Sequence, residues 1–472
     1  MSLPVVYYGS VVNPVSLKSF KALGACLIAV SSTGNIDWIV EDVHDSMVQE
    51  TMGAHGYLDV EVVCLQDGEF LIPGFIDTHT HAPQVPNIGS GQSYELLEWL
   101  ERITFPTESM FQDPDFARRT YTSVVRRIID SGTTTCCYYG TIHLEATQVL
   151  FSNYLILHAD YYLGQRAFIG KCNMDRNSPS YYIEPSVEVS MAATKALISH
   201  IKQLPSNPHA AEPLVQPILT PRFAITCTSP LLSSLGQLAA SDPNLRIQTH
   251  ISENLAEVTF TKSLFPECSS YAGAYDSFGL LRANTILAHA VHLSDDEITL
   301  IAKKKSGISH CPTSNFNLSS GVAPIGKYLD HGIKVGLGTD VSGGYSPSIL
   351  NAIQNASIAS KVIAMQTRGN PDASAEFSNK QLSVASLLYL ATSGGAEVCD
   401  LENSVGSFSV GKSFDALQVN VRNNAGNPAM WGSDSGPRSL EGMLEQFLFC
   451  GDDRNISRVY VQGKLIGGTA TR

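Results

Sequence analysis

The sequence feature that most constrains the fold is an alternation of short apolar strands with amphipathic stretches between residues 72 and 340. Helical periodicity is clear in Asp115 to Ser131 and in Leu293 to Lys305, where Ser294 is a candidate N-cap. Helices are also expected over Ser348 to Met365 and Val384 to Cys399. Repeated β/α units favour a closed parallel barrel, and an open doubly wound sheet is the alternative. Eight segments have the composition of buried strands: 72–79, 134–139, 166–172, 214–220, 245–250, 284–289, 307–311 and 333–339.

The two ends of the chain have a different pattern. Residues 1–72 and 404–472 contain short β-branched or aromatic runs separated by turn residues, which indicates antiparallel strands. We therefore predict an α/β protein with a distorted (β/α)8 TIM barrel over residues 73–403. The two end segments are expected to pair into one small β-sandwich domain beside the barrel.

Composition narrows the classes of function. The chain is 43% hydrophobic and 16% charged, with a formal net charge of −13, which argues against binding to nucleic acid or to an anionic membrane. No uninterrupted apolar run approaches the ~20 residues of a membrane span, and the N-terminus lacks a basic signal-peptide region. The 10 cysteines have no framework spacing, so we expect reduced thiols and a cytoplasmic protein.

Candidate metal ligands follow four of the predicted strands. Reactive groups of such a barrel gather at the C-terminal ends of its strands. Three imidazoles and a carboxylate with an open position suit Zn²⁺ and, less specifically, Fe²⁺. The residues at these strand ends are His79 and His81, one residue apart, then His250, His289 and Asp340.

Glu253, three residues after His250, is a candidate for proton transfer beside the metal. A carboxylate beside a metal can take a proton from a bound water and pass it to a substrate. An acidic residue favoured by the dipole at the start of a helix is the alternative role. Asp340 could likewise both ligate a metal and accept the proton of the water.

At these positions the sequence resembles the guanine deaminase family of amidohydrolases. The resemblance extends from about residue 70 to the end and is weaker before it. The His-x-His and Thr-Asp motifs are shared by the whole superfamily, whereas Ala82-Pro83-Gln84, Thr220-Pro221-Arg222-Phe223 and Gly343-Gly344-Tyr345 are more specific to this family. The motifs that carry it are Pro73 to Gln84, Leu97 to Leu100, Thr220-Pro221-Arg222-Phe223, His250 to Asn254, His310 to Asn315, Gly338 to Tyr345 and Gly451 to Asn455.

The resemblance implies a reaction and a set of residue roles. The substrate would be guanine with water, the products xanthine and ammonia, the cofactor one zinc ion per subunit, and the assembly a homodimer. His289 would bond the water or the leaving group. The implied zinc ligands are His79, His81, His250 and Asp340. The implied substrate-binding residues are Gln84, Arg222 and Phe223, with His81, His250, Glu253 and Asp340 also facing the base.

The chemistry of these residues fits that reaction. Zinc can lower the pKa of water to about 7, so a metal-bound hydroxide is expected to attack C2 of guanine. Glu253 would protonate ring N3, and Glu253 or Asp340 would then protonate the departing amine. The forked donors of Arg222 suit the O6 carbonyl, Gln84 can both donate and accept at a ring edge, and Phe223 could stack on the base.

Other interpretations remain open from the sequence. The same water and glutamate would serve a hydrolase of another purine or of a triazine ring. A non-catalytic scaffold that keeps the barrel is a third reading, although every expected ligand position is filled. Lys171, at the end of a predicted strand, could bridge two metals if carboxylated, but the His-x-x-Glu pattern at His250 favours a single metal and a structural lysine.

Overall fold

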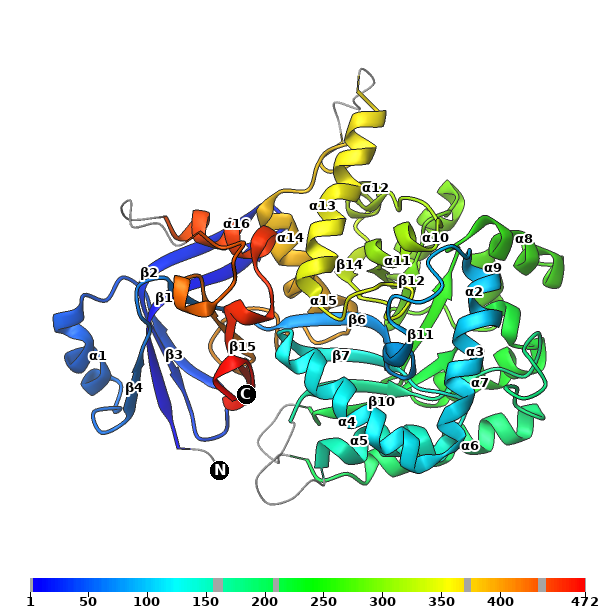
Figure 1. Ribbon diagram of the computed structural model, residues 1–472, viewed down its shortest axis with the longest axis horizontal. Coiled ribbons are helices and arrows are strands. Elements are labelled where there is room, and N and C mark those ends of the chain that lie inside the picture. The colour runs from blue at the N-terminus through cyan, green and yellow to red at the C-terminus, as the bar shows by residue number, and fades with distance from the viewer. Residues whose placement is uncertain (1–2, 156–163, 207–211, 369–374, 432–438, 472) are drawn as a thin grey trace.

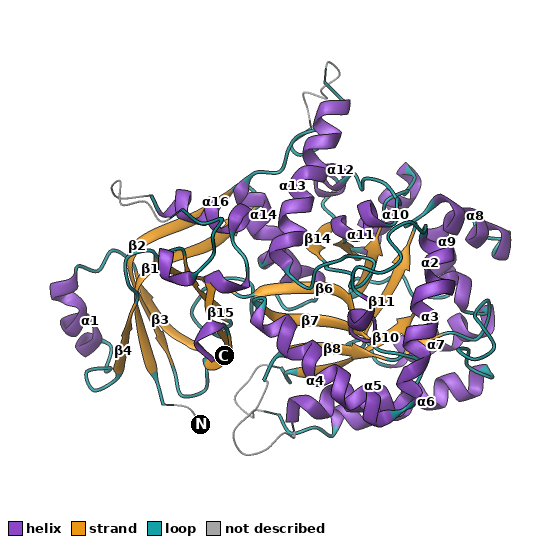
Figure 2. Ribbon diagram, viewed as in Figure 1, coloured by secondary structure: helices purple, strands orange, loops and turns teal. Residues whose placement is uncertain are grey.

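The computed structural model describes residues 3–155, 164–206, 212–368, 375–431 and 439–471. Its larger part is a barrel of parallel strands in the order β14-β13-β12-β11-β10-β8-β7-β6, with β9 (Cys172–Asn173) paired beside β10 (Figure 2). Most residues of these strands are buried, so the strands lack the strict alternation of apolar and polar residues that half-exposed strands have. The bounds are β6 Phe75–His81, β7 Thr133–Tyr139, β8 Arg166–Gly170, β10 Val215–Pro221, β11 Arg246–Ile251, β12 Thr285–His289, β13 Gly307–His310 and β14 Lys334–Leu337.

Hydrogen bonds at the C-terminal ends of β6 and β14 join the first and last strands of the barrel. The backbone N–H of Asp340 donates to the His79 carbonyl at 2.9 Å, and that of His81 donates to the Val341 carbonyl at 3.1 Å. The Thr78 hydroxyl donates to the carbonyl of Leu337 at 2.9 Å. These contacts bring the first and last predicted strand ends together.

Helices cover the outside of the barrel (Figure 1). In α10, Ser294 and Glu297 form the expected capping box. The predicted helix over Val384 to Cys399 is divided at Thr392, whose ψ of −89° is not helical. The bounds are α2 Leu96–Trp99, α3 Phe105–Ser109, α4 Pro114–Asp130, α5 Leu144–Leu155, α6 Val187–Lys202, α7 Ser229–Ser241, α8 Leu255–Leu264, α9 Tyr271–Ser277, α10 Asp295–Lys304, α11 Pro312–Asn317, α12 Ile325–Asp330, α13 Ile349–Gln366, α14 Val384–Ala391 and α15 Ser393–Val398.

The N-terminal end of the barrel is filled by apolar side chains. Ile76, Phe168 and Ile286 from three strands pack with Val398 of α15 and with neighbouring buried residues. At Gly395 in the same helix, an added Cβ would lie 2.8 Å from that of Ile76, so glycine permits this close approach. Polar groups that do chemistry are therefore expected at the opposite end.

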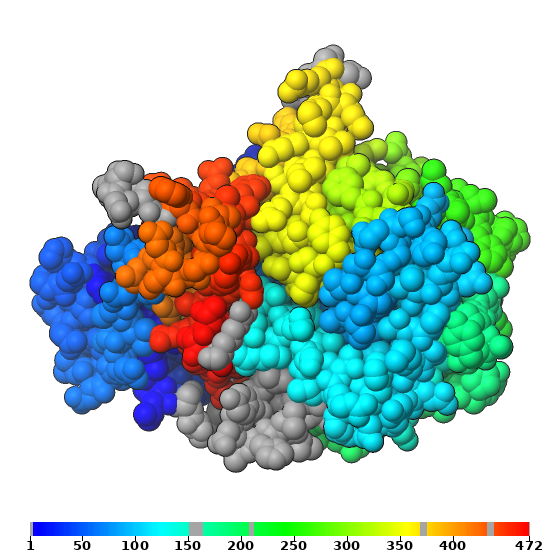
Figure 3. Space-filling view, viewed as in Figure 1, coloured from blue at the N-terminus to red at the C-terminus, as the bar shows by residue number. Residues whose placement is uncertain are grey.

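The two ends of the chain form one mixed sheet, seen on the left of Figures 1 and 3 in blue and in orange to red. Its order is β17-β16-β15-β5-β1-β2-β3, with β4 paired to β1. β15 pairs antiparallel with β5, which joins the C-terminal segment to the N-terminal one. The bounds are β1 Val5–Ser16, β2 Ser19–Val30, β3 Ile36–Val40, β4 Glu61–Cys64, β5 Glu69–Pro73, β15 Ala416–Asn420, β16 Ile456–Val461 and β17 Lys464–Gly467, with α1 Val48–Ala54 and α16 Leu440–Cys450 beside it. The predicted fold class, a (β/α)8 barrel with a small β domain from both ends, is confirmed.

Residues 406–413 have the letters of a phosphate-binding loop, Gly-x-x-x-x-Gly-Lys-Ser. Such a loop opens a helix, whereas this segment leads into strand β15. The Lys412 ammonium donates to the Val405 carbonyl and to the Ser407 hydroxyl at 2.8 Å. The motif is therefore a structural turn in this protein. Among the described residues, no helix has the length and apolarity needed to cross a membrane.

Candidate metal centre and base pocket

β6 carries the first two residues of the candidate metal centre. Every residue of β6 is buried, and His79 and His81 lie on the same side because strand side chains alternate. The carboxylate of Asp77 accepts hydrogen bonds from the backbone N–H groups of His79, at 3.2 Å, and of Thr339, at 3.0 Å. At Gly338 an added Cβ would lie 3.0 Å from the Cβ of His79. Asp77 and Gly338 therefore hold the histidine pair against the segment after β14.

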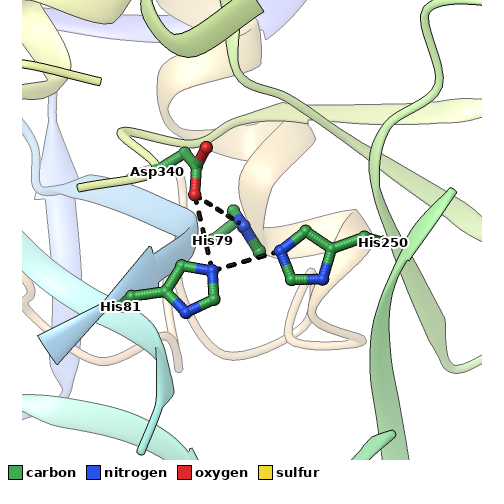
Figure 4. A group of neighbouring side chains, drawn as sticks. All are labelled: His79, His81, His250 and Asp340. Carbon is green, nitrogen blue, oxygen red and sulfur yellow. Dashed lines mark hydrogen bonds and ion pairs between the residues drawn. The ribbon is translucent and has the colours of Figure 1, made fainter. Parts of the chain in front are cut away.

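His250 of β11 and Asp340 after β14 complete the cluster (Figure 4). His79 Nε2 lies 3.0 Å from Asp340 Oδ1, and His81 Nε2 lies 3.1 Å from His250 Nε2 and 3.5 Å from Asp340 Oδ1. One ligand atom from each of the four residues lies within 4.8 Å of the others. The structure thus brings together all four residues that the sequence analysis named as metal ligands.

The protonation state of these side chains suits a divalent cation. Burial lowers the pKa values of His79, His81 and His250, so the imidazoles are neutral, as metal ligands must be. His250 Nδ1 lies 2.5 Å from the carbonyl oxygen of Arg222, which only accepts, so Nδ1 carries the proton and Nε2 offers its lone pair. Three neutral imidazoles and one carboxylate fit a zinc-type site.

Glu253 and His289 lie beside this cluster. His289 Nε2 is 3.4 Å from Glu253 Oε2 and 3.7 Å from Asp340 Oδ2, and His289 Nδ1 is 2.9 Å from Asn315 Oδ1. Burial, with the nearby Asp340 charge, raises the pKa of Glu253 well above its ordinary value. Burial opposes ionisation of Asp340 too, but the adjacent histidines hold its pKa below the ordinary value. Two neighbouring carboxyl groups with pKa values driven apart are suited to different roles.

The backbone at this end of the barrel is strained where two of these side chains leave it. His289 has φ of 73° and Asp340 has φ of 44°, the left-handed region that residues other than glycine seldom adopt. Such conformations cost energy and concentrate at functional sites, where surrounding contacts hold them. The strain supports the functional reading of both residues.

A pocket opens onto the candidate metal centre. Its walls include the predicted base-binding residues Gln84, Arg222 and Phe223. The Phe223 ring lies 6.0 Å from the His250 ring, and both are buried. The remaining lining residues are His81, Leu96, Trp99, Leu100, His250, Glu253, Leu318 and Asp340. An apolar cavity with a few convergent polar groups is the usual form of a small-molecule site.

Two residues of this region escaped the sequence analysis. Glu108 of α3 is fully buried and accepts hydrogen bonds from Arg222, Gln84 and Tyr182. Tyr182 is also fully buried. The only signal in the sequence is a glutamate at helical spacing from Phe105 in an apolar stretch, and that pattern does not reveal its partners.

Lys171, His310 and His143 lie outside the four-residue cluster. The Lys171 ammonium is buried and donates to Glu184 Oε1 at 2.5 Å and to the Cys172 carbonyl at 2.8 Å, as a structural lysine does. His310 lines a separate cavity beside α12 and α13. His143 packs 5.7 Å from the Tyr182 ring.

The chain matches the model of the Amidohydrolase family over residues 70–466. It is 43% identical over 464 residues to a probable guanine deaminase of Schizosaccharomyces pombe, a match that covers 98% of this chain and 83% of that relative. The guanine deaminase of Dictyostelium discoideum is 41% identical over 475 residues, with 98% of each chain covered. A solved guanine deaminase from C. acetobutylicum, with guanine in its active site, is 33% identical with a TM-score of 0.84, covering 98% of this chain and 100% of that one. Since the geometry, the family model and these identities agree, the chain belongs to the amidohydrolase family, in its guanine deaminase group.

Proposed function

We propose that this protein is a guanine aminohydrolase, which converts guanine and water to xanthine and ammonia. The observation that carries the proposal is one pocket lined by Glu253, by residues of the four-donor cluster and by Gln84 and Arg222. Relatives at 43% and 41% identity are named guanine deaminases. These identities favour guanine over another purine or a triazine as the substrate. A non-catalytic scaffold is not favoured either, because the ligand set is complete.

We propose one zinc ion per subunit as the cofactor. His79, His81, His250 and Asp340 would hold it, since their donor atoms converge and the imidazoles are neutral. A divalent cation bound there would supply an activated water by lowering the pKa of that water to about 7. Nitrogen donors with a single carboxylate favour zinc over harder ions such as Mg²⁺.

Glu253 is the proposed proton carrier. Its raised pKa lets the buried carboxyl hold a proton near neutral pH, so it can take one from water and give it to ring N3. This transfer accompanies formation of the C2–O bond. Glu253 or Asp340 then takes the second proton of the former water from the C2 hydroxyl and passes it to the amine, so the C2–N bond breaks, ammonia leaves and C2=O of xanthine forms. His289, held by Asn315, bonds the water or the leaving amine.

Gln84, Arg222 and Phe223 are the proposed base-binding residues. Arg222 would donate N–H groups to the O6 carbonyl, and the Gln84 amide would donate to and accept from polar atoms on one edge of the ring. Phe223 offers an aromatic face for stacking. His81, His250, Glu253 and Asp340 line the same cavity, and so they would contact the reacting side of the ring.

Three proposals concern the organisation of the protein. Residues 1–72 and 404–472 would form the small domain and residues 73–403 the barrel, which is supported by the pairing of β5 with β15. A homodimer is proposed from family membership. A cytoplasmic location is proposed because all of the cysteines are free thiols, as in a reducing compartment.

Ammonia release from a substrate panel tests the proposed function. The purified full chain is assayed with guanine, adenine, cytosine and a triazine, and bound metal is measured per chain. We expect turnover of guanine alone, with close to one zinc per chain. Turnover of another ring with guanine untouched would reject the substrate, and a folded chain without metal or activity would favour the scaffold.

A further inference from the structure

Glu108 connects the two polar residues that are proposed to read the base. Its Oε1 accepts hydrogen bonds from Gln84 Nε2 at 2.8 Å and from Arg222 Nη2 at 3.0 Å. Its Oε2 accepts from Arg222 Nη1 at 2.7 Å and from the Tyr182 hydroxyl at 2.6 Å. The carboxylate, Arg222 and Tyr182 are each at most 2% exposed, so water does not replace these bonds.

These bonds fix which way the Gln84 amide points. An ionised carboxylate only accepts, so the nitrogen of the amide must face Glu108. On the other side, the backbone N–H of Ser342 donates to Gln84 Oε1 at 3.1 Å. Both hydrogen bonds require the same orientation of the Gln84 amide, so the orientation with nitrogen and oxygen exchanged is excluded. One N–H of the nitrogen and one lone pair of the oxygen remain for a ligand.

Glu108 also orients Arg222 and balances its charge. Both terminal nitrogens donate to the carboxylate, a bidentate arrangement with strong directional preference. Phe105, three residues before Glu108 in α3, has its ring centroid 5.4 Å from Arg222 Cζ. Nη1 also donates weakly to Met174 Sδ at 3.9 Å, so two of the five guanidinium N–H groups remain for a ligand. The pair therefore presents directed donors with little net charge, which suits a neutral ring.

We propose that Glu108 is a positioning residue that sets recognition of the O6 edge of the base, an inference that rests on the proposed function. By holding both partners, it leaves donors from Arg222 and Gln84 facing an acceptor such as O6. A ring that carries hydrogen at C6 would leave these buried donors unpaired. Specificity for an oxygen at C6 thus comes from a residue that does not line the pocket itself.

The test compares Glu108→Gln with a matched control, Glu184→Gln. Glu184 is also a buried glutamate bonded to a buried cation, Lys171, but its other partners are the Met174 N–H and the Ser190 hydroxyl rather than Gln84 or Arg222. In Glu108→Gln, the new amide nitrogen would face an N–H donor of Arg222 in either orientation of the amide, so the bidentate pair is broken. The substrates are guanine and 2-aminopurine, which keeps the C2 amino group and lacks O6. When turnover of 2-aminopurine is too slow, its inhibition constant against guanine replaces KM.

In Glu108→Gln, we expect KM for guanine to rise about tenfold to a hundredfold, because bonds from charged groups are disturbed. We expect kcat and metal content to change little, and binding of 2-aminopurine to change less than about threefold. The Glu184→Gln control should change the two ligands equally. An unchanged KM for guanine, or an equal loss for both ligands, would overturn the proposal.

Glu108→Asp covers the case in which the first variant does not fold. The shorter side chain keeps the charge but cannot reach Gln84 and Arg222 together, so a selective rise in KM for guanine is expected again. Equal effects on the two ligands in this variant would also overturn the proposal. A wild-type chain that does not turn over guanine would reject the proposed function together with this inference. If the wild type is active on guanine but a folded variant shows no change in selectivity, only the positioning role of Glu108 is rejected.

Discussion

The two ends of the candidate pocket are built in different ways. The metal end is made from strand ends: β6, β11 and the segment after β14 place four donor atoms within 4.8 Å. The base end is made from a helix, a loop and a turn, where Glu108, Arg222 and Gln84 are joined by side-chain bonds. The first end depends on barrel closure, and the second depends on a buried ion pair. We therefore expect substitutions at the metal end to lower zinc content or kcat, and substitutions at the base end to raise KM and lower the free energy of unfolding.

His250→Ala should have the largest effect, because it removes a donor of the metal end. Loss of an outer-shell partner alone costs about 10–100-fold in metal affinity, so loss of a ligand should cost more. Dialysed protein should contain little zinc, and ammonia release should fall to background. His310→Ala is the control, since His310 ends another barrel strand, β13, but lines a different cavity. Full zinc retention in His250→Ala would contradict the assigned ligand set.

Glu253→Gln should have the next largest effect, and it separates chemistry from metal binding. The amide keeps the shape but cannot carry a proton, so kcat should fall by about 10²–10⁴-fold. Zinc content measured on the same sample should match that of the wild type. Glu297→Gln, at a buried capping glutamate of α10, should leave kcat unchanged. A wild-type kcat in Glu253→Gln would remove Glu253 from the mechanism.

Arg222→Ala should have the smallest effect on turnover and the clearest effect on stability. KM for guanine should rise by about tenfold to a hundredfold while zinc is retained, because the backbone carbonyl that holds His250 remains. Loss of the guanidinium leaves Glu108 buried without a cation, so the free energy of unfolding should fall by about 3–5 kcal/mol.

Chemical denaturation of Arg222→Ala and of Arg222→Ala combined with Glu108→Gln measures this cost. The double variant should be the more stable of the two, since it has no unpaired buried charge. Equal stability of the two proteins would show that the ion pair does not hold the base end together.

The barrel strands were predicted well because each is a short run of apolar, β-branched and aromatic residues between turn or helix signals. The run predicted at 284–289 is observed as Thr285–His289, and the run at 134–139 as Thr133–Tyr139. The division of the predicted helix at Thr392 was missed, because its sequence stays compatible with a helix and the packing of α15 under the barrel decides the break. The family assignment is confirmed by the comparisons, whereas the roles given to individual site residues stay predictions.

The sequence by itself determined the repeated strand and helix pattern and the ligand types at the strand ends. It did so because side-chain period and strand ends are local properties, so His79 and His81 must share one side of β6. Only the tertiary structure decided that Glu108, 114 residues away from Arg222, lies against its guanidinium. A buried carboxylate acquires a partner only when distant segments pack together, and no local pattern specifies which segments those are.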